Sequence, residues 1–338
     1  MDFSQGSTGV VSTGVVSAGI VSAGIAASAP AVALPRPSRK ALVVLGMSRS
    51  GTSLLAHVLH VLGATLPNDM LGAGPGNPLG HFEPRMLMEL NDEILASLDR
   101  RWDDPRPLPA RWFRSPQAYT FMRRIADQIR CDYGDAPILV IKDPRLCRLA
   151  PLYFEALDVL DIEPLVVLQM RPVAEVVRSL ADRDGMPPGL VEFLWLRSVV
   201  EAEAHSRSCR RVWSSMGGIM ADWPDVVRRI TDGLDLEWPM ERHEATGEIG
   251  PLLKPRLYHG AAPEPFQATL PRLSTATWAA VEQGLAGEEA AARASFDAVR
   301  AVLGDLDQMH VYYPPAVAPV HRSLLSRLSG LHRVIRRM

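Results

Sequence analysis

LGMSRSGTSLL, residues 45 to 55, follows directly on the apolar run Ala41 to Val44. An apolar run that leads into a glycine turn is typical of a buried parallel strand. After the turn, apolar residues at 54, 55, 58, 59 and 62 recur at helical spacing, and the pattern stops at Gly63. The stretch therefore predicts a strand, a glycine turn and a helix, in a domain that begins near Arg39.

The glycine turn has the spacing of the first half of a nucleotide-triphosphate loop but lacks its lysine. Gly46 and Gly51 are separated by four residues, and Thr52-Ser53 follow where that loop has lysine and then serine or threonine. Backbone N–H groups at 49 to 53 can still surround an anion at a helix N-terminus. Further donors are available on the side chains of Ser48, Arg49, Ser50, Thr52 and Ser53. The alternative is an ordinary strand-to-helix turn.

Two later runs, PILVIKD (137 to 143) and PLVVLQMR (164 to 171), also have the character of buried strands. RRVWSSM (210 to 216) is a weaker candidate for a fourth strand. Helical patterns separate the runs, at roughly 84 to 99, 116 to 131, 173 to 183 and 188 to 208. The sequence predicts a single α/β domain with a P-loop-like central parallel sheet flanked by helices. Gly46, Lys142 and Arg171 are expected along the carboxyl edge of that sheet, where ligands of open α/β sheets bind.

Composition limits the classes of partner. The formal net charge is −2, from 36 basic and 38 acidic residues, which argues against a nucleic-acid-binding surface. The cysteines at 131, 147 and 209 are too few and too far apart for a disulfide framework or a short-spaced zinc site. We expect a cytoplasmic protein, and composition leaves room for a local anion site.

The two ends of the chain differ from its centre. Residues 1 to 38 contain a repeated five-residue unit of the type Ser-Thr/Ala-Gly-Val/Ile-Val/Ile, which predicts a disordered extension, with a targeting segment as the alternative. Residues 39 to 310 are expected to form the α/β domain. Residues 311 to 338 form a basic tail with leucines at 324, 325, 328 and 331 on one helical face. Membrane contact through this tail is one interpretation, and docking on the domain or mobility is the other.

The glycine turn and two further elements resemble the sulfotransferases that use 3′-phosphoadenosine 5′-phosphosulfate, especially the bacterial members and the protein-tyrosine and glycan branches. In MSRSGTS, Arg49 takes the position of the basic residue that precedes Ser50-Gly51-Thr52 in the family's loop around the 5′-phosphosulfate. In MRPVAEVVRSL, Arg171 and Ser179 have the spacing of the pair that holds the 3′-phosphate. The resemblance implies an enzyme with this cosubstrate, bound by Arg49, Ser50, Gly51, Thr52, Ser53, Arg171 and Ser179.

The third element, IKDPRL, resembles the Lys-Asp-Pro of the protein-tyrosine branch, where the lysine neutralises charge near the transferred group. By this resemblance Lys142 and Arg49 are catalytic, and Asp143 orients Lys142 through an ion pair. A surface lysine beside a proline turn is the alternative. Asp143 is also a candidate for a magnesium ligand, although its neighbours Lys142 and Arg145 suit an anion better.

The resemblance also implies a base that deprotonates the acceptor hydroxyl. Glu83, in NPLGHFEPRMLMELNDEIL, matches by position the glutamate of the glycan and protein-tyrosine branches. His81, Glu89, Asp92 and a base supplied by the substrate are the alternatives. The histidine of the cytosolic branch has no counterpart, because Pro144 occupies its position. The reaction implied by the resemblance is in-line transfer of a sulfuryl group, which needs no metal and in which positioning and charge neutralisation dominate.

Several points stay open in the sequence. The adenosine has no stacking tryptophan after the loop, and KPRLYH (254 to 259) is a weak candidate to hold it. Trp102, Trp112 and Phe113 either stack on the acceptor, a small molecule or glycan with a hydroxyl group, or pack in the core. The other functional readings are a divergent P-loop nucleotide kinase or hydrolase, which needs Mg²⁺, and a catalytically inactive anion-binding module. The acceptor and the oligomeric state are not fixed.

Overall fold

The computed structural model describes residues 39–72, 80–240, 242–253 and 267–312. The repeats of residues 1 to 38, the segment KPRLYH and residues 313 to 338 of the expected tail lie outside these ranges. Among the described helices, none has the length and apolar content needed to cross a membrane.

A four-stranded parallel sheet forms the centre of the described domain, in the order β2-β1-β3-β4. The strands are β1 (Arg39–Leu45), β2 (Ile138–Lys142), β3 (Ile162–Met170) and β4 (Arg210–Ser215). In the register, Val44 lies opposite Lys142 on one side, and Leu45 lies opposite Leu168 on the other. The sequence predicted all four strands to within two residues, including the weak fourth one. Because the strands are parallel, their carboxyl ends meet at one edge of the sheet.

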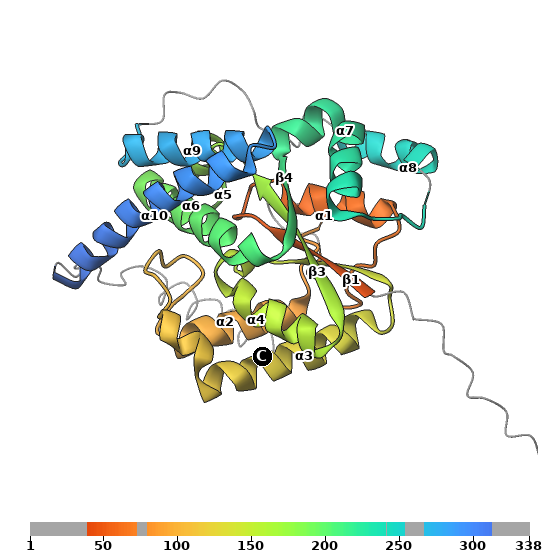
Figure 1. Cartoon of the computed structure of the whole chain (residues 1–338), viewed down its shortest axis with the longest axis horizontal. Coiled ribbons are helices and arrows are strands. Elements are labelled where there is room, and N and C mark those ends of the chain that lie inside the picture. The colour runs from red at the N-terminus through yellow and green to blue at the C-terminus, as the bar shows by residue number, and fades with distance from the viewer. Residues whose placement is uncertain (1–38, 73–79, 241, 254–266, 313–338) are drawn as a thin grey trace, which may run out of the picture. The chain divides into compact units, whose positions relative to one another are not determined.

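Helices cover both faces of the sheet (Figure 1). One face packs against α1 (Thr52–Val61) and α7 (Met216–Leu234), and alternate residues of β1 and β3 such as Leu42 and Val167 belong to that core. The other face packs against α4 (Leu146–Val159) and α6 (Pro188–His205), in a larger core that includes Val43 and Val166. The period of two along each strand thus divides the apolar side chains between two cores. The architecture is the α/β fold with a P-loop-like sheet that the sequence predicted.

The remaining elements complete the two layers. They are α2 (Arg85–Ser97), η1 (Ala110–Arg114), α3 (Pro116–Tyr133), α5 (Val173–Asp184), η2 (Ser206–Ser208), α8 (Arg242–Ile249), η3 (Gly250–Leu253), α9 (Pro271–Leu285) and α10 (Glu289–Tyr312). The predicted helices correspond to α1, α2, α3, α5 and α6. No helix was assigned at α4, α7, α9 or α10. Helices α9 and α10 lie side by side and contact α6 (Figure 1).

Candidate functional site

The glycine turn leaves the carboxyl end of β1 and enters α1 through two left-handed backbone positions. Arg49 and Gly51 have φ angles of 72° and 86°. Gly46 cannot carry a side chain, because a Cβ atom there would lie 2.4 Å from the main-chain oxygen of Gln169 on β3. The turn is therefore held close against the neighbouring strand, at the N-terminus of α1, where the first amides of a helix attract negative charge.

Lys142, at the end of β2, lies on one side of this turn and is almost fully buried. Its Nζ donates to Glu83 Oε1 at 2.6 Å, to the carbonyl oxygen of His81 at 2.9 Å and to Ser53 Oγ at 3.2 Å. The side chains of Lys142 and Glu83 are only 3% and 9% exposed. The predicted ion-pair partner of Lys142 was Asp143, and the structure instead places Glu83 there. The expected base and the expected charge-neutralising lysine are therefore in direct contact.

The segment that carries Glu83 contains two residues with a left-handed backbone conformation, which set its course. Gly80 and Phe82 have φ angles of 98° and 53°. The backbone on either side of Phe82 pairs with Leu71: Leu71 N donates to Glu83 O at 2.9 Å, and His81 N donates to Leu71 O at 3.3 Å. A left-handed conformation is costly for phenylalanine, so the surrounding contacts must hold it. The result is that the His81 carbonyl and the Glu83 carboxylate both face Lys142.

A second cationic centre lies beside β3 and α5. Arg49 Nε donates to Ser179 Oγ at 2.7 Å, and Arg171 Nη1 donates to the carbonyl oxygen of Arg49 at 2.9 Å. Arg171 Nε also donates to Glu175 Oε2 at 2.8 Å. Burial lowers the pKa of the Arg49 guanidinium, and the positive charges of Arg183 and Arg171 lower it further. An anion bound here would relieve that repulsion.

The sequence placed Arg49 at the transferred group and Arg171 with Ser179 at the opposite end of the cosubstrate. In the structure the Arg49 side chain contacts Ser179, so Arg49, Arg171 and Ser179 form one group. Lys142 and Ser53 form the other, with Glu83. Ser50 and Thr52 are buried within the turn, at 2% and 4% exposure.

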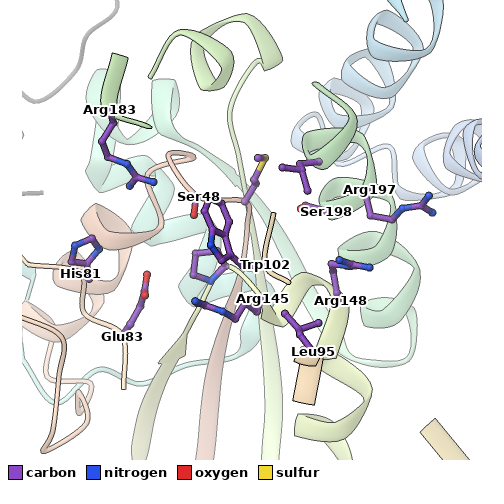
Figure 2. Close-up of a pocket in the computed structure, with 13 residues that line it drawn as sticks. Ser48, His81, Glu83, Leu95, Trp102, Arg145, Arg148, Arg183, Arg197 and Ser198 are labelled. Carbon is purple, nitrogen blue, oxygen red and sulfur yellow. The ribbon is translucent and has the colours of Figure 1, made fainter. Parts of the chain in front are cut away.

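Next to the Lys142 centre is a pocket of about 160 Å³. Figure 2 shows His81 and Glu83 on one side of it, Arg148, Arg197 and Ser198 on the other, and Trp102 between them. The complete lining consists of Met47, Ser48, His81, Glu83, Leu95, Trp102, Pro144, Arg145, Arg148, Arg183, Leu194, Arg197 and Ser198. A hydroxyl group bound in this pocket can reach the Glu83 carboxylate.

His81 and Glu83, the two leading candidates for the base, both line the pocket. Burial lowers the pKa of the His81 imidazole, an effect that the negative charge of Glu83 opposes. A neutral imidazole can accept a proton, so His81 stays a rival on chemical grounds. Of the other candidates, Glu89 is exposed to solvent and Asp92 accepts a two-point contact from Arg145, with Nε–Oδ1 at 2.6 Å and Nη2–Oδ2 at 3.0 Å.

Asp143 is buried at the start of the loop after β2. Its Oδ1 accepts from the backbone N–H of Arg145 at 2.7 Å, and its Oδ2 pairs with Arg145 Nη1 at 3.1 Å. Burial raises the pKa of the Asp143 carboxyl, although the Arg145 charge acts against this. The carboxylate is thus engaged with a guanidinium. Within the described ranges, no group of three or more His, Cys, Asp or Glu side chains is arranged to hold a metal ion.

The three aromatic residues proposed for the acceptor separate into two roles. Trp102 is half-buried and lines the pocket. Trp112 is a core residue: its ring lies 5.4 Å from that of Phe113, and its Nε1 donates to Gln117 Oε1 at 2.8 Å. Phe113 packs against the same core. Of the three, Trp102 is the one that lines the pocket, and part of its side chain packs against the core as well.

The sequence analysis missed three arginines of the pocket: Arg148, Arg183 and Arg197. Arg183 follows Ser179 by four residues on α5, so helical spacing places both on one face and could have indicated it. The positions of Arg148 and Arg197 depend on how α4 and α6 pack, and no local pattern marks them.

No protein-family model matches this chain, and no curated protein matches it. Among solved structures, the sulfotransferase domain of the olefin synthase from Synechococcus PCC 7002 is 17% identical, with a TM-score of 0.40 over 73% of this chain and 97% of that domain. The sulfotransferase domain from the curacin biosynthetic pathway is 11% identical, with a TM-score of 0.38 over 70% of this chain and 96% of that domain. Such distant likenesses leave the function to be derived from the residues of the site.

Proposed function

We propose that this protein is a sulfotransferase that moves the sulfuryl group of 3′-phosphoadenosine 5′-phosphosulfate to an acceptor hydroxyl. The observation that carries the proposal is the pair of cationic centres at one sheet edge. Lys142 ends β2, Arg171 follows β3, and the glycine turn leaves β1 between them. A ligand with an anionic group at each end, bound across the turn, satisfies both centres.

The residues fit such a ligand chemically. Arg171, Arg49 and Ser179 offer guanidinium and hydroxyl donors to a phosphate, and charge-assisted contacts of this kind are the strong ones. At the other end, Lys142 and the amides of the turn neutralise the phosphosulfate. Arg49 is thereby assigned to the 3′-phosphate with Ser179, on the strength of its 2.7 Å contact.

The reaction follows from the same geometry. Glu83 accepts the proton of the acceptor hydroxyl while the hydroxyl oxygen forms its bond to sulfur. The bond between sulfur and the bridging oxygen breaks, and 3′-phosphoadenosine 5′-phosphate leaves. Lys142 donates to the oxygens that gain negative charge, which is the electrostatic stabilisation expected of a transfer with spread charge. The 2.6 Å contact between Lys142 and Glu83 keeps the two groups within reach of the same atoms.

Calorimetry without magnesium tests the cosubstrate. We expect 3′-phosphoadenosine 5′-phosphate to bind at least about tenfold more tightly than adenosine 5′-phosphate, because charge-assisted hydrogen bonds each contribute about 1.5–3 kcal/mol. Arg171→Ala should abolish this preference, and Arg124→Ala, which changes an exposed arginine of α3, should keep it. Equal affinity for the two nucleotides, together with magnesium-dependent binding of ATP, would favour a nucleotide kinase or hydrolase instead.

Binding of the bisphosphate without transfer to any acceptor would instead indicate a binding module. Turnover separates a binding module from an enzyme. The unsubstituted protein, Glu83→Gln and His81→Gln are each mixed with the donor and a panel of phenolic, sugar and aliphatic alcohols, and release of 3′-phosphoadenosine 5′-phosphate is measured. We expect Glu83→Gln to lose turnover and to retain cosubstrate binding. Loss of turnover in His81→Gln alone would move the base to His81.

A further inference from the structure

The loop of residues 99 to 109, here named the Trp102 loop, forms one wall of the pocket and contains no helix or strand. It connects α2 to η1. A loop of this kind has no ladder of backbone hydrogen bonds to fix it, so its shape depends on the contacts that surrounding elements make with it. Trp102 and Leu108 pack against the larger core, and two of the pocket arginines bind the backbone between them.

Arg148 of α4 and Arg197 of α6 bind three successive carbonyl groups of the Trp102 loop. Arg148 Nη1 donates to Asp104 O at 2.7 Å, and Arg148 Nη2 donates to Arg106 O. Arg197 Nε donates to Pro105 O at 2.9 Å. Both arginines are 5% exposed. Two guanidinium groups from separate helices therefore hold the backbone at residues 104 to 106, two to four positions after Trp102.

Carboxylates hold the two arginines in turn. Glu201 of α6 accepts from Arg148 Nε at 3.2 Å and lies 3.7 Å from Arg197 Nε. Asp307 of α10 pairs with Arg197 Nη2. Each of the three nitrogens of Arg148 thus donates to an acceptor of the protein itself. Although they line a pocket, these arginines are placed to shape it, and their charges are balanced by Glu201 and Asp307.

We infer that Arg148 and Arg197 are positioning residues that fix Trp102 as the acceptor-facing wall of the pocket, with Asp307 setting Arg197 from α10. The statement that this wall faces an acceptor rests on the proposed function. The statement that Arg148 and Arg197 fix the wall is independent of it. Selection among acceptors would accordingly depend on α4, α6 and α10 as well as on the residues that touch the acceptor.

The inference can be tested on the full chain without any acceptor. The seven tryptophans are labelled with 5-fluorotryptophan, and the Trp102 resonance in the fluorine NMR spectrum is assigned with Trp102→Phe. Arg148→Lys and Arg197→Lys keep the positive charge but cannot reproduce the guanidinium contacts. We expect both to shift or broaden the Trp102 resonance. Asp307→Asn, the mildest change, should do the same to a smaller extent.

Arg211→Lys is the matched control. Arg211 is equally buried, pairs with Glu203 at 2.9 Å, and lies over the ring of Trp213 with 5.8 Å from its guanidinium carbon to the ring centroid. This variant should move the Trp213 resonance and leave that of Trp102 in place, which separates a local effect from a general loss of stability. An unchanged Trp102 resonance in Arg197→Lys and Asp307→Asn overturns the inference, even if Arg148→Lys does not fold.

A second readout keeps the two proposals apart. Calorimetric affinity for 3′-phosphoadenosine 5′-phosphate should stay within about twofold of the unsubstituted protein in Arg197→Lys, because Arg197 contacts neither cationic centre. Failure of the unsubstituted protein to bind the bisphosphate would refute the proposed function alone. A Trp102 resonance that does not respond would refute the positioning role alone.

Discussion

The buried ion pair between Lys142 and Glu83 makes a quantitative prediction about stability and affinity together. Glu83→Gln keeps the shape of the side chain and an acceptor oxygen but removes the negative charge next to Lys142. Taking one partner from a buried pair costs about 3–5 kcal/mol. Lys142 retains the His81 carbonyl and Ser53 Oγ as acceptors, at 2.9 and 3.2 Å. We therefore expect the free energy of unfolding to fall by about 3 kcal/mol, the lower end of the range for breaking a buried pair.

The same change should strengthen the binding of the product nucleotide. In the substituted protein, the 5′-phosphate supplies the negative charge that Lys142 has lost, so ligand binding recovers part of the lost stability. If about half is recovered, the affinity for 3′-phosphoadenosine 5′-phosphate rises about tenfold, since 1.4 kcal/mol corresponds to a factor of ten. A catalytic defect accompanied by tighter binding would distinguish the loss of a base from the loss of the site.

Glu93→Gln provides the control, because the pair between Glu93 and Arg124 has the same 2.6 Å separation but side chains that are 52% and 48% exposed. Exposed pairs contribute about 0.2–1 kcal/mol, so this variant should change stability little and affinity not at all. Urea unfolding gives the first quantity and calorimetry the second. A loss below about 1 kcal/mol in Glu83→Gln, or an affinity that falls, would falsify the electrostatic account of the site.

Three further changes test other parts of the structure. Gly46→Ala places a Cβ atom 2.4 Å from a main-chain oxygen of β3, so it should lower stability by about 2–3 kcal/mol and abolish binding of the bisphosphate, whereas Gly185→Ala, with no atom within 4 Å of the added Cβ, should lower stability by about 1 kcal/mol for its left-handed conformation. Burial raises the pKa of Asp132, so its protonated form is favoured in the folded state and its stabilising effect is lost as pH rises. Asp132→Asn should accordingly raise the melting temperature at pH 8 and change it little at pH 4. Burial raises the pKa of the Cys147 thiol to about 12, so iodoacetamide at pH 8 should modify the exposed Cys131 and reach Cys147 only on unfolding, as peptide mass analysis can show.

The parts of the fold that follow from local pattern were predictable. Three strands are apolar runs, of which two end in polar or charged residues and one leads into the glycine turn, and buried parallel strands have that composition. Helix α4 was missed although buried residues such as Leu146, Leu149 and Tyr153 recur at helical spacing, because Pro151 lies inside it and a proline normally ends a helical pattern. Helix α7 begins at Met216-Gly217-Gly218 and has a non-helical residue at Asp222. Tertiary packing stabilises both helices against a weak local preference.

In the site, too, the identity of single side chains was predictable from the sequence, and their contacts were not. Glu83 and Lys142 could be named from the sequence, but their mutual contact could not, because it requires Phe82 to adopt a φ of 53° that phenylalanine rarely takes. Arg49 was assigned to the transferred group from its place in the loop. In the structure, Arg49 has a φ of 72°, and its guanidinium donates a hydrogen bond to Ser179 on α5.

The backbone of a phosphate-binding turn therefore decides which end of a ligand each of its side chains can serve, and a motif reports only that the side chain is present. In the proposed function, Lys142 and the amides of the helix N-terminus therefore neutralise the charge near the reacting sulfur. Lys142 donates to Glu83, the group that takes the acceptor proton in the reaction we propose. In the proposed reaction, the anionic donor competes with Glu83 for Lys142, so that donor binding weakens the Lys142–Glu83 ion pair and makes the Glu83 carboxylate more available to the acceptor. The order in which donor and acceptor enter the site is thereby linked to one buried ion pair.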